Sequence, residues 1–362
     1  MRWSAVTLDC HTGREIVKMH RRDFLQTLSG VAVAMNSAAF ARAGDASSPS
    51  HIRRFHFVHV DVFTSTPLSG NPLYVFTDAG GLCEADMQAL ARETHLYETT
   101  FVFPRDATTE RERGVSVRIF TPEGEIPFAG HPTLGTAAVL RNLRSIQGSP
   151  LVPNAQNASE IILDLKIGRV PVSFNADKSG NIIGEMTQVA PTFGAVHDKA
   201  TIAQLYGLAS SDIADDGPIQ TVSTGLPFAI VPLQRLSALE SLRIDHEKMT
   251  AFLARQHDKF GFYCVTRDTG EPGVTLRARC LNLNNEDPAT GSAAGCAATW
   301  LLRNEITTSN QVVHIRQGIE LKRPSEIFAR ATKEGDKIGN VRVGGRTVQT
   351  MEGEAELPAS GC

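Results

Sequence analysis

The sequence predicts an α+β protein of two pseudo-symmetric halves, each a β-sheet or barrel wrapped around one buried central helix. Three observations lead to this fold class: a hidden internal repeat, two helical segments without a polar face, and short strand-like runs before each of them. The composition agrees, because 41% hydrophobic and 21% charged residues are typical of a globular chain with a sizeable core. The net charge of −3 and the dispersed positive charges argue against nucleic acid as a partner.

The first 50 residues are expected to be a leader outside the fold. Arg21 and Arg22 precede a mild apolar run at 27–40, and Ala-Arg-Ala follows at 41–43, with Met19 as the more natural start. This is the pattern of a cleaved twin-arginine export signal. The apolar run is shorter than the roughly 20 residues that a membrane span needs, so stable membrane insertion is not expected. The pattern predicts a periplasmic protein, or a cytoplasmic one if the signal is not used; the alternative is a disordered leader with a chance arginine pair.

Next along the chain comes the repeat, in which motifs recur in the same order at an offset of about 160 residues. A Gly-x-Pro turn leads into a short apolar run at 70–76 and again at 225–231, which predicts a turn followed by a strand. A helix-patterned stretch and a β-rich run follow in both copies, at 87–94 and 99–103 and then at 249–257 and 262–266. We therefore expect an N-terminal half at 51–170, a C-terminal half at 171–345 and a tail at 346–362.

Each copy closes with a helical segment of unusual composition. The segments 133–140 and 292–302 consist mainly of small and apolar residues, and the first charges are Arg141 and Arg303. A helix that is apolar all round is surrounded by protein. The alternative, two amphipathic surface helices, would need a polar face that neither segment has. Both are therefore expected to be buried central helices.

The N-termini of these two helices are the expected binding site. A helix N-terminus presents unpaired backbone N–H groups and a partial positive charge, even when the helix is buried. If the halves pack with pseudo-twofold symmetry, both N-termini face one cleft and form a site for a carboxylate. The residues expected to bind the substrate there are Gly130, His131, Asp287, Thr290, Gly291 and Ser292.

The repeat differs between its copies at one informative position. Glu98 enters the β-rich run of the first copy, whereas Gly261 occupies the corresponding position of the second. Burial at that point would raise the pKa of Glu98 and make it a usable general base and acid. The alternative is a glutamate that faces solvent at a strand edge.

Four segments resemble the phenazine-biosynthesis isomerase-like (PhzF) family, and together they extend over roughly 55–345: 61–72, 97–102, 120–133 and 286–293. The resemblance implies a diaminopimelate-epimerase-like fold, a homodimer, and activity without a metal or an organic cofactor. It also implies that Glu98 takes a proton from one carbon and returns it to another. His131 and Asp287 match substrate-positioning residues, and Asn71, in the first matching segment, is grouped with them. Gly130, Gly291 and Ser292 match anion-contacting backbone.

Two departures from the family pattern are expected to reshape the pocket. Tyr97 stands where the family has a small serine, and the segment before Glu286 lacks the usual Phe-x-Pro turn. The family's known substrate is therefore not transferred to this chain.

Other chemistries fit less well. The related two-cysteine epimerases place a thiol at each helix N-terminus, where this chain has Ala129 and Pro288-Ala289. The cysteines lack C-x-x-C spacing, so no metal is expected, and Cys264 and Cys296 are interpreted as packing residues. Ser292 opens a helix outside a G-x-S-x-G elbow, which favours capping over a hydrolase nucleophile.

The expected function is thus a cofactor-independent isomerase that acts on a small carboxylate-bearing metabolite, with Glu98 as the proton shuttle. The alternative is a periplasmic binding protein that keeps the same cleft without turnover.

Overall fold

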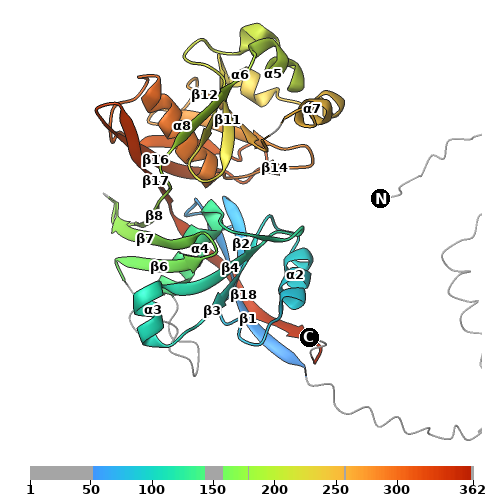
Figure 1. Cartoon of the computed structure of the whole chain (residues 1–362), viewed down its shortest axis with the longest axis vertical. Helices are drawn as coiled ribbons and strands as arrows, with labels where there is room; N and C mark the ends of the chain where they lie inside the picture. The colour runs from blue at the N-terminus through green and yellow to red at the C-terminus, as the bar shows by residue number, and fades with distance from the viewer. Residues whose placement is uncertain (1–51, 143–157, 178, 257, 360–362) are drawn as a thin grey trace, which may run out of the picture. The chain divides into compact units, whose positions relative to one another are not determined.

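The computed structural model describes residues 52–142, 158–177, 179–256 and 258–359, which all belong to one unit of the chain. The expected leader, with its export signal at 19–43, lies outside the described residues. The fold is mixed α/β and dominated by strands (Figure 1). Among the described helices, none is long and apolar enough to cross a membrane.

One group of strands forms a ladder in which each member pairs with the next. In ladder order these strands are β18 (Thr347–Leu357), β1 (Arg53–Val62), β2 (Asn71–Phe76), β3 (Thr99–Phe103), β4 (Val115–Phe120), β6 (Glu160–Leu165), β7 (Gly168–Ala176) and β8 (Ile182–Thr187). The β2–β3 and β4–β6 pairs are parallel, and the others are antiparallel. The short β5 (Glu125–Ile126) pairs with β4, and helices α2 (Glu84–Glu93) and α3 (Ala107–Arg113) complete this group.

A second group repeats this order of pairings. Its strands are β9 (Thr192–Val196), β10 (Gln220–Ser223), β11 (Pro227–Leu233), β12 (Gly261–Thr266), β13 (Leu276–Leu281), β15 (Val313–Gln317), β16 (Ser325–Glu334) and β17 (Lys337–Gly345). The parallel pairs are β11–β12 and β13–β15, and the short β14 (Glu286–Asp287) pairs with β13. Its smaller helices are α5 (Lys199–Leu205), η1 (Ser210–Asp212), α6 (Leu236–Glu240) and α7 (His246–Leu253). The antiparallel pair β8–β17 joins the two groups into one continuous ladder.

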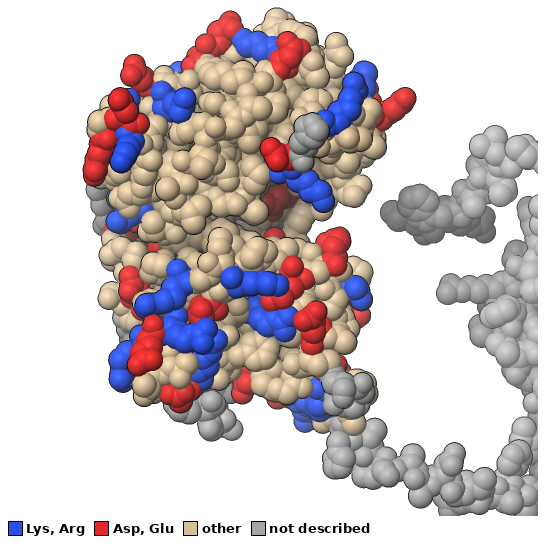
Figure 2. Space-filling view, viewed as in Figure 1, with Lys and Arg blue, Asp and Glu red and all other residues tan. Residues whose placement is uncertain are grey.

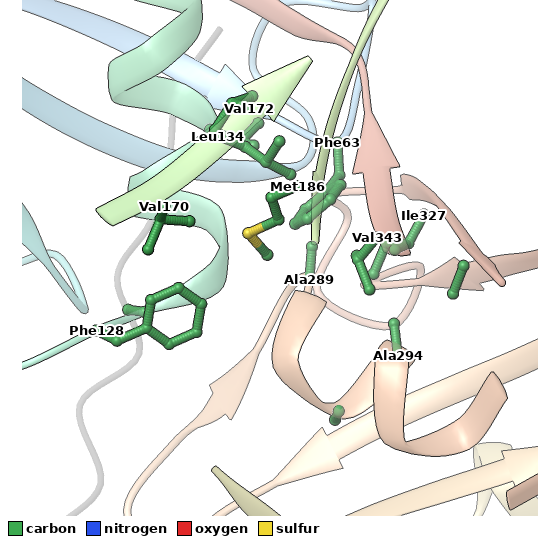
Figure 3. Close-up of a cluster of buried hydrophobic side chains, with 14 of the residues drawn as sticks. Phe63, Phe128, Leu134, Val170, Val172, Met186, Ala289, Ala294, Ile327 and Val343 are labelled. Carbon is green, nitrogen blue, oxygen red and sulfur yellow. The ribbon is translucent and has the colours of Figure 1, made fainter. Parts of the chain in front are cut away.

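Helices α4 (Gly130–Asn142) and α8 (Gly291–Arg303) are buried on all sides, through residue 140 in α4 and residue 302 in α8. Helix α4 packs on β1, β2 and β6, whereas α8 packs on β16, β17 and β11. One apolar cluster includes side chains from both helices and from the strands around them, among them Leu134 of α4, Met186 of β8 and Ala294 of α8 (Figure 3). The small side chains of the helices let the strands approach closely.

Several local predictions hold. The β-rich run at 99–103 is strand β3. Both repeated turns contain a glycine with positive φ, 64° at Gly70 and 132° at Gly225, which is why glycine suits them. The helix expected from residue 133 begins earlier, at Gly130, because Pro132 is tolerated in the first turn of a helix.

Two expected boundaries differ from the structure. The boundary expected after residue 170 falls inside β7, which continues to Ala176 because it pairs with β6 on one side and β8 on the other. The stretch expected as a tail from residue 346 contains β18, which pairs with β1 along its whole length. The C-terminal strand therefore returns to the first group of strands (Figure 1).

Candidate active site

The N-termini of α4 and α8 are in direct contact. A Cβ atom placed on Gly130 would lie 3.1 Å from the backbone nitrogen of Ser292 and 3.5 Å from the carbonyl carbon of Gly291. The first residues of both helices thus lie side by side. Their partial positive charges add at one place, which favours a bound anion there.

Glu98 and His131 meet beside this contact. Glu98 directly precedes β3, and its Oε2 lies 3.7 Å from Nε2 of His131. The Glu98 side chain is 18% exposed and that of His131 only 6%, so Glu98 is the more accessible of the two. Neither of the two facing atoms has a hydrogen-bond partner among the described residues. Buried polar atoms without partners mark a place where a ligand can supply them.

Asn71, the first residue of β2, links both sides of the site. Its Nδ2 donates to Nδ1 of His131 at 3.1 Å, to Oδ1 of Asp287 at 2.8 Å and to the carbonyl of Ala289 at 2.9 Å. Because an amide nitrogen can only donate, this contact favours the neutral His131 tautomer with its proton on Nε2. That proton then points toward Glu98.

Asp287 is held by the loop that leads into α8. Its Oδ2 accepts a hydrogen bond from the Thr290 hydroxyl at 2.7 Å. Gln317, at the end of β15, donates to the Asp287 carbonyl at 2.8 Å and to the Thr290 hydroxyl at 2.9 Å. The other end of Gln317 accepts from the Thr290 backbone and from the hydroxyl of Tyr263. The position of Asp287 is therefore fixed on several sides.

Burial shifts the pKa values of the Glu98, Asp287 and His131 side chains. It raises the pKa of Glu98 to about 8, and the nearby carboxylates of Asp287 and Glu123 add to the increase. It raises the pKa of Asp287 to about 6, although hydrogen bonds from Thr290 and Asn71 oppose the increase. Desolvation lowers the pKa of His131 to about 3. Near neutral pH, Asp287 is therefore largely ionised, His131 is uncharged, and Glu98 exchanges protons readily.

These groups border a cavity of about 400 Å³. Of the expected site residues, Glu98, Asp287, Thr290 and Ser292 line it. Asn71 and His131 do not line the cavity but contact residues that do, Asp287 and Glu98 respectively. Gly130 and Gly291 lie where the two helices touch. The remaining wall is formed by Tyr97, Leu226, Pro227, Phe228, Lys259, Phe260, Gly261, Cys280 and Asn282. Figure 2 shows a hollow between the two groups of strands, with acidic side chains inside it.

Sequence reasoning missed Gln317 and Lys259. Gln317 carries a usable signal: Val313 and Ile315 are buried in the same register of β15, so a glutamine two residues further is a polar group in a core position. Lys259 contributes positive charge to the cavity lining, but it lies in an irregular stretch before β12 whose sequence gives no such signal.

The two cysteines that were interpreted as packing residues lie in the core. Cys264 and Cys296 are fully buried, as expected, and burial raises the thiol pKa to about 12 and about 11. Cys280 lines the cavity, and burial raises its pKa even further. Within the described ranges, no group of three or more His, Cys, Asp or Glu side chains is arranged to hold a metal ion.

Comparisons with known proteins place the chain in a family. The family model described as phenazine biosynthesis-like protein matches residues 60–353. Trans-2,3-dihydro-3-hydroxyanthranilate isomerase of Pseudomonas chlororaphis is 34% identical, over 83% of this chain and 99% of its own. An uncharacterized isomerase of Mesorhizobium japonicum is 32% identical, over 83% of this chain and 98% of its own.

Solved structures resemble the fold as well. A phenazine biosynthesis protein of the PhzF family from Bacillus anthracis superposes with a TM-score of 0.73 and 25% identity, covering 84% of this chain and 99% of its own. A predicted epimerase from Pseudomonas aeruginosa gives a TM-score of 0.66 and 32% identity, covering 84% and 100%. A probable proline racemase from Agrobacterium radiobacter shares the fold alone, at 12% identity and a TM-score of 0.55, covering 83% and 92%.

Proposed function

The chain belongs to the phenazine biosynthesis-like family, and we propose that it moves a proton between two carbons of a small carboxylate-bearing metabolite without a cofactor. Curated relatives that match nearly their whole length are named isomerases, and the chain is an isomerase of this type. The finer claims, that Glu98 is the shuttle and that no cofactor takes part, are our proposal.

The observation that carries the proposal is the place of Glu98. Its carboxyl group lines the cavity, lies 3.7 Å from a neutral histidine and has a pKa of about 8. A carboxyl group with an ordinary pKa is a weak base at pH 7, whereas one with a pKa near the working pH both accepts and returns protons efficiently. Ser292 lines the same cavity as Glu98, and the N-termini of α4 and α8 meet at this residue, which supports binding of the substrate carboxylate there.

The proposed reaction has two steps. Ionised Glu98 removes a proton from a carbon of the substrate, and the electron pair spreads into the conjugated system that ends at the substrate carboxylate. The first N–H groups of α8 and the Ser292 hydroxyl stabilise that charge. Protonated Glu98 then gives its proton to a second carbon, so the double bond has moved and no atom is gained or lost. His131, through Nε2–H, orients the Glu98 carboxyl group so that it reaches both carbons in turn.

A direct test is proton exchange in D₂O. The purified chain is incubated with trans-2,3-dihydro-3-hydroxyanthranilate, on which the Pseudomonas relatives are named to act, and separately with an extract of small carboxylates. Mass spectrometry should find a compound of unchanged atomic composition that changes retention time, and it should carry one deuterium at carbon wherever protonated Glu98 exchanges with D₂O before it returns the proton. If the folded protein isomerises no compound, the proposed function is wrong.

The binding-protein alternative has less support, because the relatives are named isomerases. It would be favoured by a ligand that binds in this cavity and shows no exchange with the solvent in the wild-type protein.

We further propose that the two groups of strands are copies of one unit, each built around its own buried helix. The shared order of parallel and antiparallel pairs and the burial of α4 and α8 support this. Residues 70–142 and 225–304 should superpose in an experimental structure, with β2 on β11 and α4 on α8.

Export through the twin-arginine signal and assembly into a homodimer remain proposals that rest on the sequence and the resemblance. Replacing Arg21 and Arg22 by Lys should leave the protein in the cytoplasm, whereas the unchanged chain should reach the periplasm without its first ~43 residues. Light scattering of the mature protein should give twice the mass of one chain.

A further inference from the structure

Tyr97 lines two cavities. It lines the cavity of about 400 Å³ that contains Asp287 and Ser292, and it also lines a second one of about 360 Å³ on the side of Pro122 and Glu123. Tyr97 and Glu98 are the residues that the two linings have in common. Both residues therefore border both spaces.

The Tyr97 ring is anchored at its far end. Its hydroxyl donates to the backbone carbonyl of Glu286 at 2.7 Å. The Glu286 carboxylate is itself held by Nε and Nη2 of Arg279, both at 2.8 Å, and Nη1 of Arg279 donates to the carbonyl of Leu239 at 3.0 Å. Burial raises the pKa of Tyr97 well above its usual range, so the phenol remains a hydrogen-bond donor.

This hydrogen bond joins the immediate neighbours of the two carboxylates in the site. Tyr97 precedes Glu98 in the first group of strands, and Glu286 precedes Asp287 in the second. The bond therefore ties together the two backbone segments that carry the acidic groups. Because a misplacement of about 1 Å can cost a hundredfold in rate, such a tie matters for proton transfer.

We propose that Tyr97 is a positioning and size-limiting residue: its hydroxyl sets the distance between Glu98 and Asp287, and its ring restricts the substrate to the cavity next to α8. This inference rests on the proposed function, but it is tested by binding, which needs no turnover.

The test compares wild type with Tyr97→Phe and Tyr97→Ala, using benzoate and biphenyl-4-carboxylate as probes in calorimetric titrations. Wild type and Tyr97→Phe should bind benzoate at least tenfold more tightly than the biphenyl acid, because both keep the ring that limits the substrate to one cavity. Tyr97→Ala should lose that discrimination. The same ratio in all three proteins, or no binding of benzoate by wild type, would overturn the size limit. Tyr97→Leu replaces Tyr97→Ala if the alanine variant does not fold.

The Tyr97→Phe variant tests the positioning role separately, because it removes the hydroxyl and keeps the ring. Without the bond to Glu286, the two acidic segments can separate, so the pKa of Glu98 from a ¹³C NMR titration should fall by about one unit. Exchange at saturating substrate should slow about tenfold while the Kd for benzoate is unchanged. Tyr74→Phe, which removes a phenol hydroxyl from a half-buried tyrosine of β2, is the matched control. An unchanged pKa of Glu98 in Tyr97→Phe would refute the positioning role. Failure of the proposed function would instead appear as exchange that survives Glu98→Gln.

Discussion

Oε2 of Glu98 and Nε2 of His131 face each other at 3.7 Å, which is beyond hydrogen-bond distance. Asn71 fixes the imidazole from behind, so the gap cannot be closed by a turn of the ring alone. A small shift of the Glu98 side chain would complete the contact. Catalytic hydrogen bonds are often long before substrate binds and shorten afterwards. The pair therefore leaves two buried polar atoms that a ligand would satisfy.

The first prediction is that Glu98→Gln abolishes proton exchange and leaves ligand binding nearly intact. Glutamine keeps the shape and the hydrogen-bonding capacity of the side chain, but it cannot accept a proton from carbon. The loss in exchange rate should be 10²-fold or more, since general bases contribute roughly that much. Mass spectrometry in D₂O and calorimetric titration of the same ligand measure the two quantities.

Glu110→Gln is a suitable control for that variant. Glu110 is also a buried glutamate whose pKa is raised by desolvation, but it lies in α3 and accepts from the Arg105 backbone. The Glu110→Gln variant should keep an exchange rate within about twofold of wild type, because the substitution is remote from the candidate active site. Equal losses in both variants would mean that the effect is a general loss of folding.

The second prediction concerns the pH dependence of turnover. The reaction starts with ionised Glu98, so kcat/KM should rise with pH and level off above the pKa of about 8. Because the negative charge of Asp287 contributes to this raised value, Asp287→Asn should shift the midpoint of the rise to lower pH. A profile of kcat/KM from pH 5 to 10 tests both points; a flat profile would exclude Glu98 as the group that titrates.

The third prediction concerns stability. The pKa of Glu98 is about 8 in the folded chain and near 4.5 when exposed, so the folded state binds one more proton between these values. Stability should therefore be full below about pH 4.5 and decrease as pH rises toward 8. Glutamine has no proton to lose, so Glu98→Gln is free of this pH-dependent loss. The free energy of unfolding of the variant should exceed that of wild type by an amount that grows with pH to a few kcal/mol. Urea unfolding of both proteins at pH 5, 7 and 9 gives the comparison; a constant difference across that range contradicts it.

Much of this site could be predicted because its signals are local. The absence of a polar face identified α4 and α8, and the break in the repeat at Glu98 singled out one carboxyl group. His131 and Asp287 were found from their positions at the helix N-termini, and Asn71 connects them in the structure. Such signals depend on composition and spacing within one segment.

What the sequence missed depends on contacts between distant segments. Strand β18 was expected as a tail, because its pairing with β1 is set only when both strands have folded. The hydrogen bond from Tyr97 to the Glu286 carbonyl joins residues in different groups of strands, and nothing in either segment alone indicates it. The local sequence pattern of a segment predicts its secondary structure, but not its position relative to a distant segment.

The fourth prediction is that Asn71→Ala weakens both binding and stability. Asn71 is fully buried, and its loss leaves Nδ1 of His131 and Oδ1 of Asp287 without their donor. Each unsatisfied buried group costs about 1–3 kcal/mol. The melting temperature should fall, and ¹⁵N NMR of His131 should show a mixture of the two neutral tautomers. Asn175→Ala, at an exposed position of β7, should change neither the melting temperature nor the His131 tautomer. An unaltered tautomer in Asn71→Ala would mean that another group fixes the imidazole.

The last prediction concerns Gly295, in the middle of α8. Glycine inside a helix usually costs about 1 kcal/mol relative to alanine, so Gly295→Ala would ordinarily stabilise the protein. Here a Cβ atom would lie 1.9 Å from Oε1 of Gln188, whose Nε2 donates to the Gly291 carbonyl at 3.1 Å. Gln188 follows β8, and its buried amide would have to move aside and give up its hydrogen bond to the Gly291 carbonyl at the N-terminus of α8. We expect Gly295→Ala to lower the free energy of unfolding by about 1–3 kcal/mol, as overpacking does.

The reason for this loss can be isolated with a second substitution. In Gln188→Ala the space beside residue 295 is free, so adding Gly295→Ala to it should cost much less, or even stabilise. The coupling energy from the four proteins should thus be at least 1 kcal/mol, measured by urea unfolding. Gly124→Ala, in a turn where a Cβ atom meets nothing within 4 Å, provides the control and should be neutral. If the losses from Gly295→Ala and Gln188→Ala simply add, Gln188 is not what requires glycine at residue 295. A coupled pair would instead show that the N-terminus of α8 is held in place by a side chain from the other group of strands.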